Sequence, residues 1–406
     1  MAIDNKDKKV LKSSIEREQN EVACSAECEK IKGSKNLNVP HLRFPEFSGE
    51  WEMVSLQDIA TINPKSDPLQ NTFIYIDLEA VEKGELRKIQ EIMREEAPSR
   101  AQRVIDNNDI LFQCVRPYQK NNYIHRILNT SNQQWVASTG YAQIRTTELP
   151  NYIYHLLNTD EFNRKVMVRC TGSSYPAINS EDLATIHLYY TPDKKEQLKI
   201  SRLLDLLDKR IATQNKIIEK LQSLIKGIAQ HCIKESTSGN TYVKLGDICQ
   251  ITTGKLDANA QVDNGIYPFF TCAEQPFKID SFAFDTEALL ISGNGANLGY
   301  INYYKGKFNA YQRTYVLDLF SENIQYIKWA LKVLLPKRIA IEKSSSNTPY
   351  IVLSTLTDLR LPIPCKSKQS FIANLMQSLE RKLSNQIAQY DSYNYLKQYL
   401  LRQMFI

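Results

Sequence analysis

The chain has 406 residues, of which 51 are Lys or Arg and 45 are Asp or Glu, so its formal net charge is +6. This length allows two domains of ordinary size, and the weak positive charge permits a polyanionic partner without requiring one. Scattered cysteines exclude a paired zinc site, and no apolar run is long enough to span a membrane, so we expect a soluble cytoplasmic protein with reduced cysteines.

Residues 1–38 are polar and charged, with few large apolar side chains after Leu11. This composition predicts a loosely held N-terminal arm that contributes little to a core. The segment Pro40–Phe47 then places prolines beside aromatic residues. Such a segment commonly leads a chain into a folded domain.

Residues 39–193 form the first predicted domain. Short apolar or alternating runs, separated by Pro, Asn, Asp and Gly clusters, predict strands, and one periodic stretch predicts a helix near Tyr152–Val168. The strands are expected at 73–78, 109–115, 136–144 and 185–190. The domain is therefore of mixed α and β structure.

A long amphipathic helix is predicted over residues 194–235. Its apolar residues fall on one stripe of a helix. They are Ile200, Leu203, Leu204, Leu207, Ile211, Ile218, Leu221, Leu224, Ile225 and Ile228. The 37 residues from Glu196 to Cys232 would span ~55 Å as a helix, which is more than a single globular core needs.

The second half has the same organisation. Residues 242–364 form a second mixed α and β domain, followed by a second predicted helix over 366–404. Its strands are expected near 288–292, 300–304 and 315–319, with a helix near 324–335.

The two halves are an internal repeat. Val54–Ile62 reappears as Val243–Ile251, and the two long helices align without a gap. In the helices, Gln197, Ile200, Leu203, Leu207, Gln214 and Leu224 fall on Gln369, Ile372, Leu375, Leu379, Gln386 and Leu396. We therefore expect an α+β protein with a pseudo-two-fold repeat, whose long helices pack antiparallel as a coiled-coil spacer between the domains. The alternative is that each helix folds back onto its own domain.

Motifs for catalysis and cofactor binding are missing. The glycines of Ser292–Gly299 have the wrong spacing for a dinucleotide-binding loop, and a strand is expected after them where that motif needs a helix. Gly254-Lys255 lacks the flanking residues of a phosphate-binding loop, and Pro192-Asp193 lacks the downstream acidic-x-Lys of a nuclease core. We expect no catalytic residue, cofactor or metal.

Polar residues in predicted loops are the candidates for DNA contacts. In the first domain, Arg116, Tyr118 and Lys120 follow a strand and could meet phosphates or guanine, although Arg116 could equally be tied to a carboxylate of its own domain. In the second domain, the amides and basic groups suited to adenine and phosphate are Asn294, Asn297, Lys305, Lys307 and Arg313, and loops rich in Asn are also commonly turns.

A third pair of loops lies shortly before the last strand of each domain. Its candidates are Ser173, Ser174 and Tyr175 in the first copy, and Ser345 and Asn347 in the second. Small hydroxyl residues before a proline can donate to phosphate, but capping of the following segment is the favoured alternative.

Candidate residues for binding partner proteins lie on the helices. They are Leu203, Leu207, Ile211, Leu375, Leu379 and Leu383.

Together these features resemble the specificity subunit of type I restriction-modification systems. The matching pieces include Leu42–Phe47 with Gly49-Glu50-Trp51, and the repeated Leu-x-Asp-Ile openings. Also matching are Asp109–Tyr118 with Ser138-Thr139-Gly140, Gly299–Tyr304 with Gln312–Tyr315, and the two closing helices. The resemblance covers the chain from about residue 40 onwards.

The resemblance implies a non-catalytic subunit with two target-recognition domains that read the two halves of a split double-stranded DNA sequence. It also implies docking of two methyltransferase subunits and, through them, of restriction subunits. Two alternatives remain: a specificity chain of a type II-like restriction-modification enzyme, and a coiled-coil scaffold with no role in DNA binding.

Overall fold

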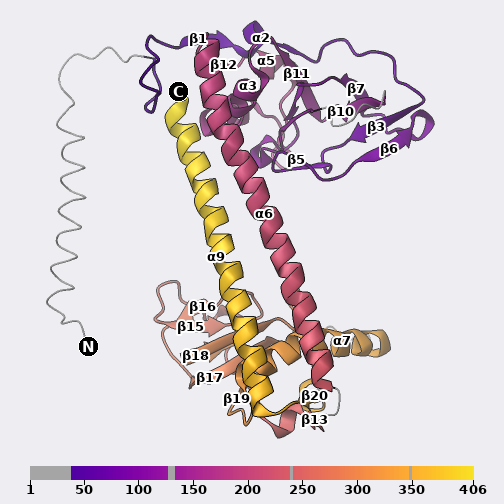
Figure 1. Ribbon diagram of the computed structural model, residues 1–406, viewed down its shortest axis with the longest axis vertical. Coiled ribbons are helices and arrows are strands. Elements are labelled where there is room, and N and C mark those ends of the chain that lie inside the picture. Colours follow the sequence, from indigo (N-terminus) through magenta and orange to yellow (C-terminus); the bar gives the residue numbers. More distant parts are fainter. Residues whose placement is uncertain (1–37, 127–132, 238–240, 347–349) are drawn as a thin grey trace, which may run out of the picture. The chain divides into compact units, whose positions relative to one another are not determined.

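The computed structural model describes residues 38–126, 133–237, 241–346 and 350–406. The predicted N-terminal arm therefore lies outside the described residues, apart from Asn38. The chain divides into two compact units (Figure 1). Unit 1 consists of the residues up to Lys209 together with Tyr393–Ile406, and unit 2 consists of Arg210–Ser392.

Unit 1 contains two four-stranded sheets, with strand orders β2-β11-β8-β9 and β6-β3-β10-β7, and two strand pairs, β1-β12 and β4-β5. The strands are β1 Glu52–Ser55, β2 Ala60–Ile62, β3 Thr72–Ile76, β4 Val81–Glu82, β5 Glu85–Leu86, β6 Gln90–Met93, β7 Ala101–Ile105, β8 Ile110–Gln113, β9 Tyr123–Ile124, β10 Gln134–Ser138, β11 Tyr141–Thr146 and β12 His187–Tyr190. The α-helices are α2 Leu56–Ile59, α3 Pro150–Leu157, α4 Asp160–Arg169 and α5 Ser180–Ala184.

Unit 2 contains one six-stranded sheet, with strand order β14-β19-β17-β18-β15-β16, and the strand pair β13-β20. The strands are β13 Thr241–Lys244, β14 Gln250–Thr253, β15 Tyr267–Phe270, β16 Phe277–Ile279, β17 Phe284–Ser292, β18 Ile301–Ala310, β19 Thr314–Asp318 and β20 Arg360–Ile363. The helices are α7 Ile324–Ser346 and α8 Leu353–Thr357.

The predicted internal repeat is confirmed by the strand order. β2-β11-β8-β9 of unit 1 and β14-β19-β17-β18 of unit 2 have the same order along the chain and in the sheet. In each unit, the first strand also pairs antiparallel with the last, β1 with β12 and β13 with β20. Unit 1 has in addition the sheet β6-β3-β10-β7 and the pair β4-β5, and unit 2 has in addition the strands β15 and β16.

Three predicted elements differ from the structure. The single helix near Tyr152–Val168 is two helices, because the side chain of Thr159 accepts the N–H of Phe162 and starts α4. The strand expected at 136–144 is divided into β10 and β11, because the chain turns at Thr139 and Gly140.

The third difference is at the end of α7, which continues beyond the predicted end at Leu335. It runs through Pro336 to Ser346. Proline removes one helical hydrogen bond and commonly kinks or ends a helix. The later turns are supported by packing of Ile339 on the core and by the pair of Arg338 Nε and Glu342, 2.8 Å apart.

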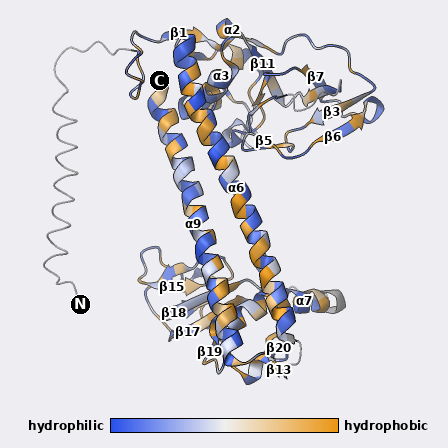
Figure 2. Cartoon of the chain, in the orientation of Figure 1, coloured by the Kyte–Doolittle hydropathy of each residue, from blue (hydrophilic) through white to orange (hydrophobic). Residues whose placement is uncertain are grey.

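The two long helices are α6, Lys194–Thr237, and α9, Lys366–Met404. Apolar and polar residues alternate along both (Figure 2), as expected for amphipathic helices. Each helix contributes to the cores of both units. The core of unit 1 contains Ile200 and Leu204 of α6 with Leu400, Leu401 and Met404 of α9. The alternative in which each helix packs only on its own domain is therefore wrong.

Within unit 2, α6 and α9 run antiparallel. Lys368 Nζ near the start of α9 donates to the carbonyl oxygen of Glu235 near the end of α6, at 3.1 Å. Further along, Gln214 Nε2 donates to Gln386 Oε1 at 2.9 Å. Gln214 and Gln386 are the equivalent residues of the two repeats, so this hydrogen bond joins a residue to its own counterpart.

A buried glutamine ties the first turn of α6 to the sheet of unit 1. Gln197 is 0% exposed. Its Nε2 donates to the Glu148 carboxylate at 2.6 Å and to the carbonyl oxygen of Thr191 at 2.7 Å, while its Oε1 accepts the N–H of Leu149 at 3.2 Å. The amide thus satisfies both the end of β11 and the segment that enters α6.

Gln369 makes the same contacts at the start of α9 in unit 2. Its Nε2 donates to Glu322 at 2.6 Å and to the carbonyl oxygen of Pro364 at 2.9 Å. Its Oε1 accepts the N–H of Asn323 at 3.0 Å. The gapless alignment of the two helices therefore corresponds to one anchoring arrangement used twice.

Gln197→Leu is expected to lower the free energy of unfolding of unit 1 by about 1–3 kcal/mol, because buried polar groups would lose their partners while the volume is retained. Urea denaturation of the purified chain would measure the change. Gln398→Leu, at an exposed position of α9 in the same unit, is the control and should change stability by less than about 0.5 kcal/mol. Equal effects of the two substitutions would contradict the anchoring role of Gln197.

His125 of unit 1 is fully buried, with its ring 4.9 Å from Trp135 and 6.1 Å from Tyr123. Neither ring nitrogen has a hydrogen-bond partner among the described residues. Burial lowers the pKa of His125 to about 4, since the charged form is poorly solvated there. The imidazole is therefore neutral at physiological pH.

This pKa predicts an acid-sensitive step in the stability of unit 1. Between about pH 6.5, where unfolded His takes up a proton, and about pH 4, the unfolded state binds a proton that the folded state does not. The free energy of unfolding should fall by up to about 3 kcal/mol across this window. His125→Phe should remove that part of the pH dependence in urea titrations, whereas His41→Phe, at an exposed site, should leave it unchanged.

Candidate nucleic-acid interface

Three loops meet at one place in unit 1: residues 114–120 after β8, 139–140 between β10 and β11, and 171–178 after α4. Backbone hydrogen bonds hold them together. Cys114 N donates to the carbonyl oxygen of Gly140 at 2.9 Å, and Ile178 N donates to that of Cys114 at 3.1 Å. Arg116 N donates to the carbonyl oxygen of Pro176 at 2.8 Å. We call these loops junction 1.

The same three loops meet in unit 2: residues 293–299 after β17, 311–313 between β18 and β19, and 350–352 before α8. Gly293 N donates to the carbonyl oxygen of Arg313 at 2.8 Å, and Ile351 N donates to that of Gly293 at 2.8 Å. We call these loops junction 2. The two junctions share this hydrogen-bond pattern, with Gly293 in the place of Cys114.

Gly293 shows how the junctions differ in detail. A Cβ atom there would lie 2.4 Å from the carbonyl oxygen of Arg313, so the close approach of the loops in junction 2 requires glycine. Junction 1 has Cys114 at this place, and its loops accommodate a side chain. The backbone hydrogen bonds are therefore the same in both junctions, but the side chains around them differ.

In junction 1, Arg116 and Tyr175 come together although they are distant in sequence. The guanidinium carbon of Arg116 lies 4.4 Å from the ring centroid of Tyr175. Arg116 makes no ion pair with a carboxylate in the described part of the chain, so the alternative of a structural salt bridge has no support. Its backbone is left-handed, with φ 55° and ψ 54°, directly before Pro117.

The other candidates of the first loop differ in their availability. Tyr118 is 51% exposed. Lys120 is already paired: its Nζ lies 2.8 Å from Asp160 Oδ1 and also donates to the carbonyl oxygen of Asn158 at 3.3 Å. The hydrogen bond from Lys120 to the Asp160 carboxylate holds the pKa of Asp160 below its usual value. Lys120 thus joins the loop to the start of α4.

Ser173, Ser174 and Tyr175 are exposed. The residue that caps the following helix α5 is Asn179, whose side chain accepts the N–H of Asp182. The capping interpretation of the two serines is therefore wrong. Both serines are on the surface, in the same loop as Tyr175.

In junction 2, Arg313 lies over the ring of Tyr350, with 6.0 Å between the guanidinium carbon and the ring centroid. Asn294 forms a β-bridge with Tyr350. Asn297 lies in a turn, as its alternative interpretation expected, and its Nδ2 donates to the carbonyl oxygen of Cys272 at 3.1 Å. Tyr350, which sequence reasoning did not select, is brought to this site by pairing across more than 50 residues.

The remaining candidates of the second domain lie outside junction 2 or outside the described residues. Lys305 and Lys307 are exposed on β18; Lys305 Nζ is 3.5 Å from Glu287, and Lys307 Nζ is 4.6 Å from the centroid of the Phe282 ring. Ser345 belongs to α7, but its side chain is not among the described ones. Asn347 lies outside the described residues.

The candidates for partner binding on the helices have mixed exposure. Leu207, Leu379 and Leu383 are partly buried against the cores of their own units. Ile211 and Leu375 are half-buried, and Leu203 is 36% exposed. More exposed apolar positions include Leu224 at 53% and its repeat equivalent Leu396 at 44%, which the sequence analysis aligned but did not name as candidates for partner binding.

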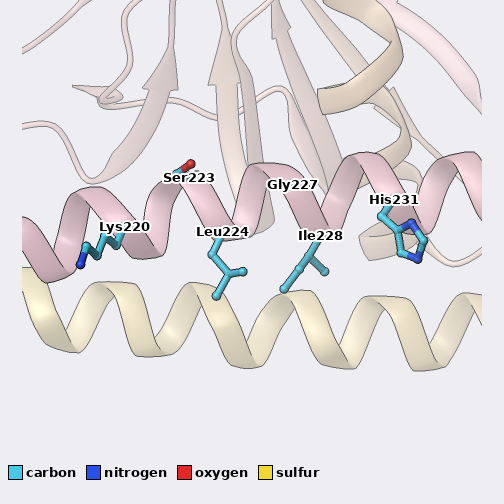
Figure 3. A pocket seen from close by; sticks show the side chains of 6 residues that line it. All are labelled: Lys220, Ser223, Leu224, Gly227, Ile228 and His231. Carbon is cyan, nitrogen blue, oxygen red and sulfur yellow. The ribbon is translucent and has the colours of Figure 1, made fainter.

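Leu224 also lines a groove of about 530 Å³ in unit 2. Figure 3 shows Leu224 and Ile228 pointing from α6 toward α9, with Lys220 and His231 at the two ends of the groove.

Among the described residues, no cluster of His, Cys, Asp or Glu could hold a metal ion, and no helix could cross a membrane. The candidate binding sites of the described residues are therefore the two loop junctions and the exposed surfaces of the helices.

Comparison with known proteins relates this architecture to one family. The family model described as the type I restriction modification DNA specificity domain matches residues 48–223 and 237–390. The chain is 44% identical over 137 residues to the type I restriction enzyme EcoDI specificity subunit of Escherichia coli, covering 34% of this chain and 30% of that protein. It is 24% identical over 274 residues to the MjaIX specificity subunit of Methanocaldococcus jannaschii, covering 58% of this chain and 63% of that one.

The fold is also similar to a solved structure, that of the type I restriction-modification S subunit from M. genitalium. The TM-score is 0.62 at 17% sequence identity, covering 91% of this chain and 99% of the other. The chain matches less than two thirds of the lengths of the EcoDI and MjaIX relatives, so those alignments describe parts of these proteins.

Proposed function

Since this chain belongs to the family of type I restriction modification DNA specificity domains, we propose that it is the DNA-reading subunit of a type I restriction-modification complex. The target-recognition domains are residues 39–193 and 242–364, and the spacer helices are residues 194–235 and 366–404. The observation that carries the proposal is the pair of junctions, in which one backbone framework presents unlike side chains. Two unlike surfaces on a repeated framework suit a target with two unlike half-sites.

The proposed DNA contacts are the candidate residues of the two domains, some of which belong to the junctions. They are Arg116, Tyr118, Lys120, Ser173, Ser174 and Tyr175 in the first domain, and Asn294, Asn297, Lys305, Lys307, Arg313, Ser345 and Asn347 in the second. The exposed basic and amide groups supply donors for phosphates and base edges. Because Lys120 and Lys305 are paired with carboxylates, their contribution is expected to be smaller than that of Arg116 and Arg313.

The subunit itself carries no catalytic group. It acts in the cytoplasm by docking two methyltransferase subunits and, through them, restriction subunits, which supply the chemistry. No observation favours a type II-like enzyme, and a scaffold without DNA binding leaves Arg116 and Arg313, which have no carboxylate partner among the described residues, without a role.

The repeat also supports two equivalent docking surfaces for the methyltransferase subunits. Leu224 in unit 2 and Leu396 in unit 1 are equivalent positions, and both expose a large apolar side chain. A surface that is retained in both copies is suited to a partner that binds twice. We place one methyltransferase subunit on each of these helix faces.

Co-expression of the chain with its methyltransferase subunit, followed by mapping of methylated bases across the host genome, tests the function. The expected result is a split motif with two different half-sites and a fixed gap. Cells that express the methyltransferase subunit alone are the control. An assembled complex that adds no methylation, and whose duplex binding does not depend on salt, would support the scaffold alternative.

Leu224→Glu and Leu396→Glu are each expected to remove one methyltransferase subunit from the complex. A charged group in an apolar contact should weaken that contact at least about tenfold. The mass of the purified complex would show the stoichiometry, and the double variant should bind none. Gln222→Glu and Gln398→Glu introduce the same charge at exposed polar positions of α6 and α9, and should leave two subunits bound.

A further inference from the structure

In both junctions an arginine lies over a tyrosine, but the residues come from positions that do not correspond. By the shared hydrogen bonds, Arg313 takes the place of Gly140 and not that of Arg116. Tyr350 directly precedes Ile351, which is equivalent to Ile178, so Tyr350 takes the place of Ala177 and not that of Tyr175. Inheritance from the common repeat therefore does not explain why both units have such a pair.

The pairing of these arginines differs from that of other arginines in the molecule. Arg43, Arg145 and Arg402 each contact a carboxylate at 2.8 Å or less. Within the described ranges, Arg116 and Arg313 have only the aromatic ring as a side-chain partner. A ring covers one face of a guanidinium group and leaves the N–H groups at its edge free to donate.

The backbone of Arg116 is held in one conformation, which fixes the position of its Cα–Cβ bond. A left-handed conformation is unfavourable for a residue with a Cβ, and the α regions are further disfavoured directly before proline. The conformation is held by the bond from Arg116 N to Pro176, 2.8 Å, and by the bond from Gln119 N to the carbonyl oxygen of Arg116, 3.0 Å. Strain of this kind is characteristic of functional positions.

We propose that Arg116 and Arg313 are specificity-determining residues, and that each reads a guanine in the half-site bound by its own unit. Their paired N–H donors match the O6 and N7 acceptors of guanine in the major groove, which is the commonest specific contact made by arginine. Tyr175 and Tyr350 are positioning residues, which hold the guanidinium groups with their donor edges outward. This inference rests on the proposed DNA-reading function.

The test is the methylation motif of the complete complex with its methyltransferase subunit. Arg116→Gln should reduce the preference for guanine at one position of one half-site by about 5- to 150-fold, and leave the other half-site and the gap unchanged. Arg313→Gln should do the same in the opposite half-site. The unaffected half-site reports, within the same complex, that the variant folds and assembles.

Conservative variants test the geometry. Arg116→Lys keeps the charge but loses the paired donors, so it should also relax the guanine position. Tyr175→Phe keeps the ring and should retain the motif, whereas Tyr175→Ala should relax the same position as Arg116→Gln. Arg164→Gln, at an exposed arginine of α4 paired with Glu161, removes the same charge and is the control that should retain the motif.

Three outcomes would overturn the assignment. One is an unchanged motif in Arg116→Gln, and another is an unchanged motif in Arg116→Lys. The third is uniformly weaker binding to synthetic duplexes of every sequence, with the salt slope reduced by about 1, which would make Arg116 a phosphate contact. A failure of the proposed function can be distinguished from these outcomes. If the chain were not the DNA-reading subunit, even the wild-type complex would produce no split motif.

Discussion

A buried glutamine anchors the first turn of each long helix, α6 in unit 1 and α9 in unit 2, and the rest of the architecture depends on this constraint. Gln197 and Gln369 each satisfy three polar groups at the point where a sheet gives way to a helix. The carboxylates that they bind, Glu148 and Glu322, are also paired with Lys194 and Lys366. Since buried polar groups are costly when unpaired, the first helical turn has one arrangement that satisfies all of them.

Once its first turn is fixed, the apolar stripe of each helix can pack only on one side. In unit 1 this brings Ile200 and Leu204 into the core beside the last residues of α9. In unit 2 it brings Leu221 and Ile225 into the core beside Ile372 and Met376. The stripe is thus used mainly within the protein. Some apolar positions of the helices, such as Leu224 and Leu396, are not covered by either core and keep apolar surface exposed.

The sequence predicted the features that depend on local or repeated patterns. The repeat, the long helices and the loops that hold the candidate residues followed from periodicity and self-similarity. Local patterns were less reliable where a single side chain decides the outcome. Thr159 begins a new helix within a periodic stretch, and Pro336 does not end α7, because later turns pack on the core.

The meeting of Arg116 with Tyr175, and of Arg313 with Tyr350, could not be predicted from sequence. Both pairs depend on backbone hydrogen bonds between loops that lie far apart in the chain. The left-handed conformation of Arg116 likewise has no signal in composition, since it is imposed by the loops around it. Propensity describes the segments, and pairing between segments decides which side chains share a surface.

The hydrogen bond between Gln214 and Gln386 has a consequence for how a duplicated gene can persist. Immediately after a duplication, both copies carry the same amino acid at this position, and the two identical side chains face each other. A carboxylate or an ammonium group would then meet a like charge, whereas an amide has both a donor and an acceptor and can bond to its own kind. Self-complementary residues at such positions let a tandem copy fold before any mutation has distinguished the two halves.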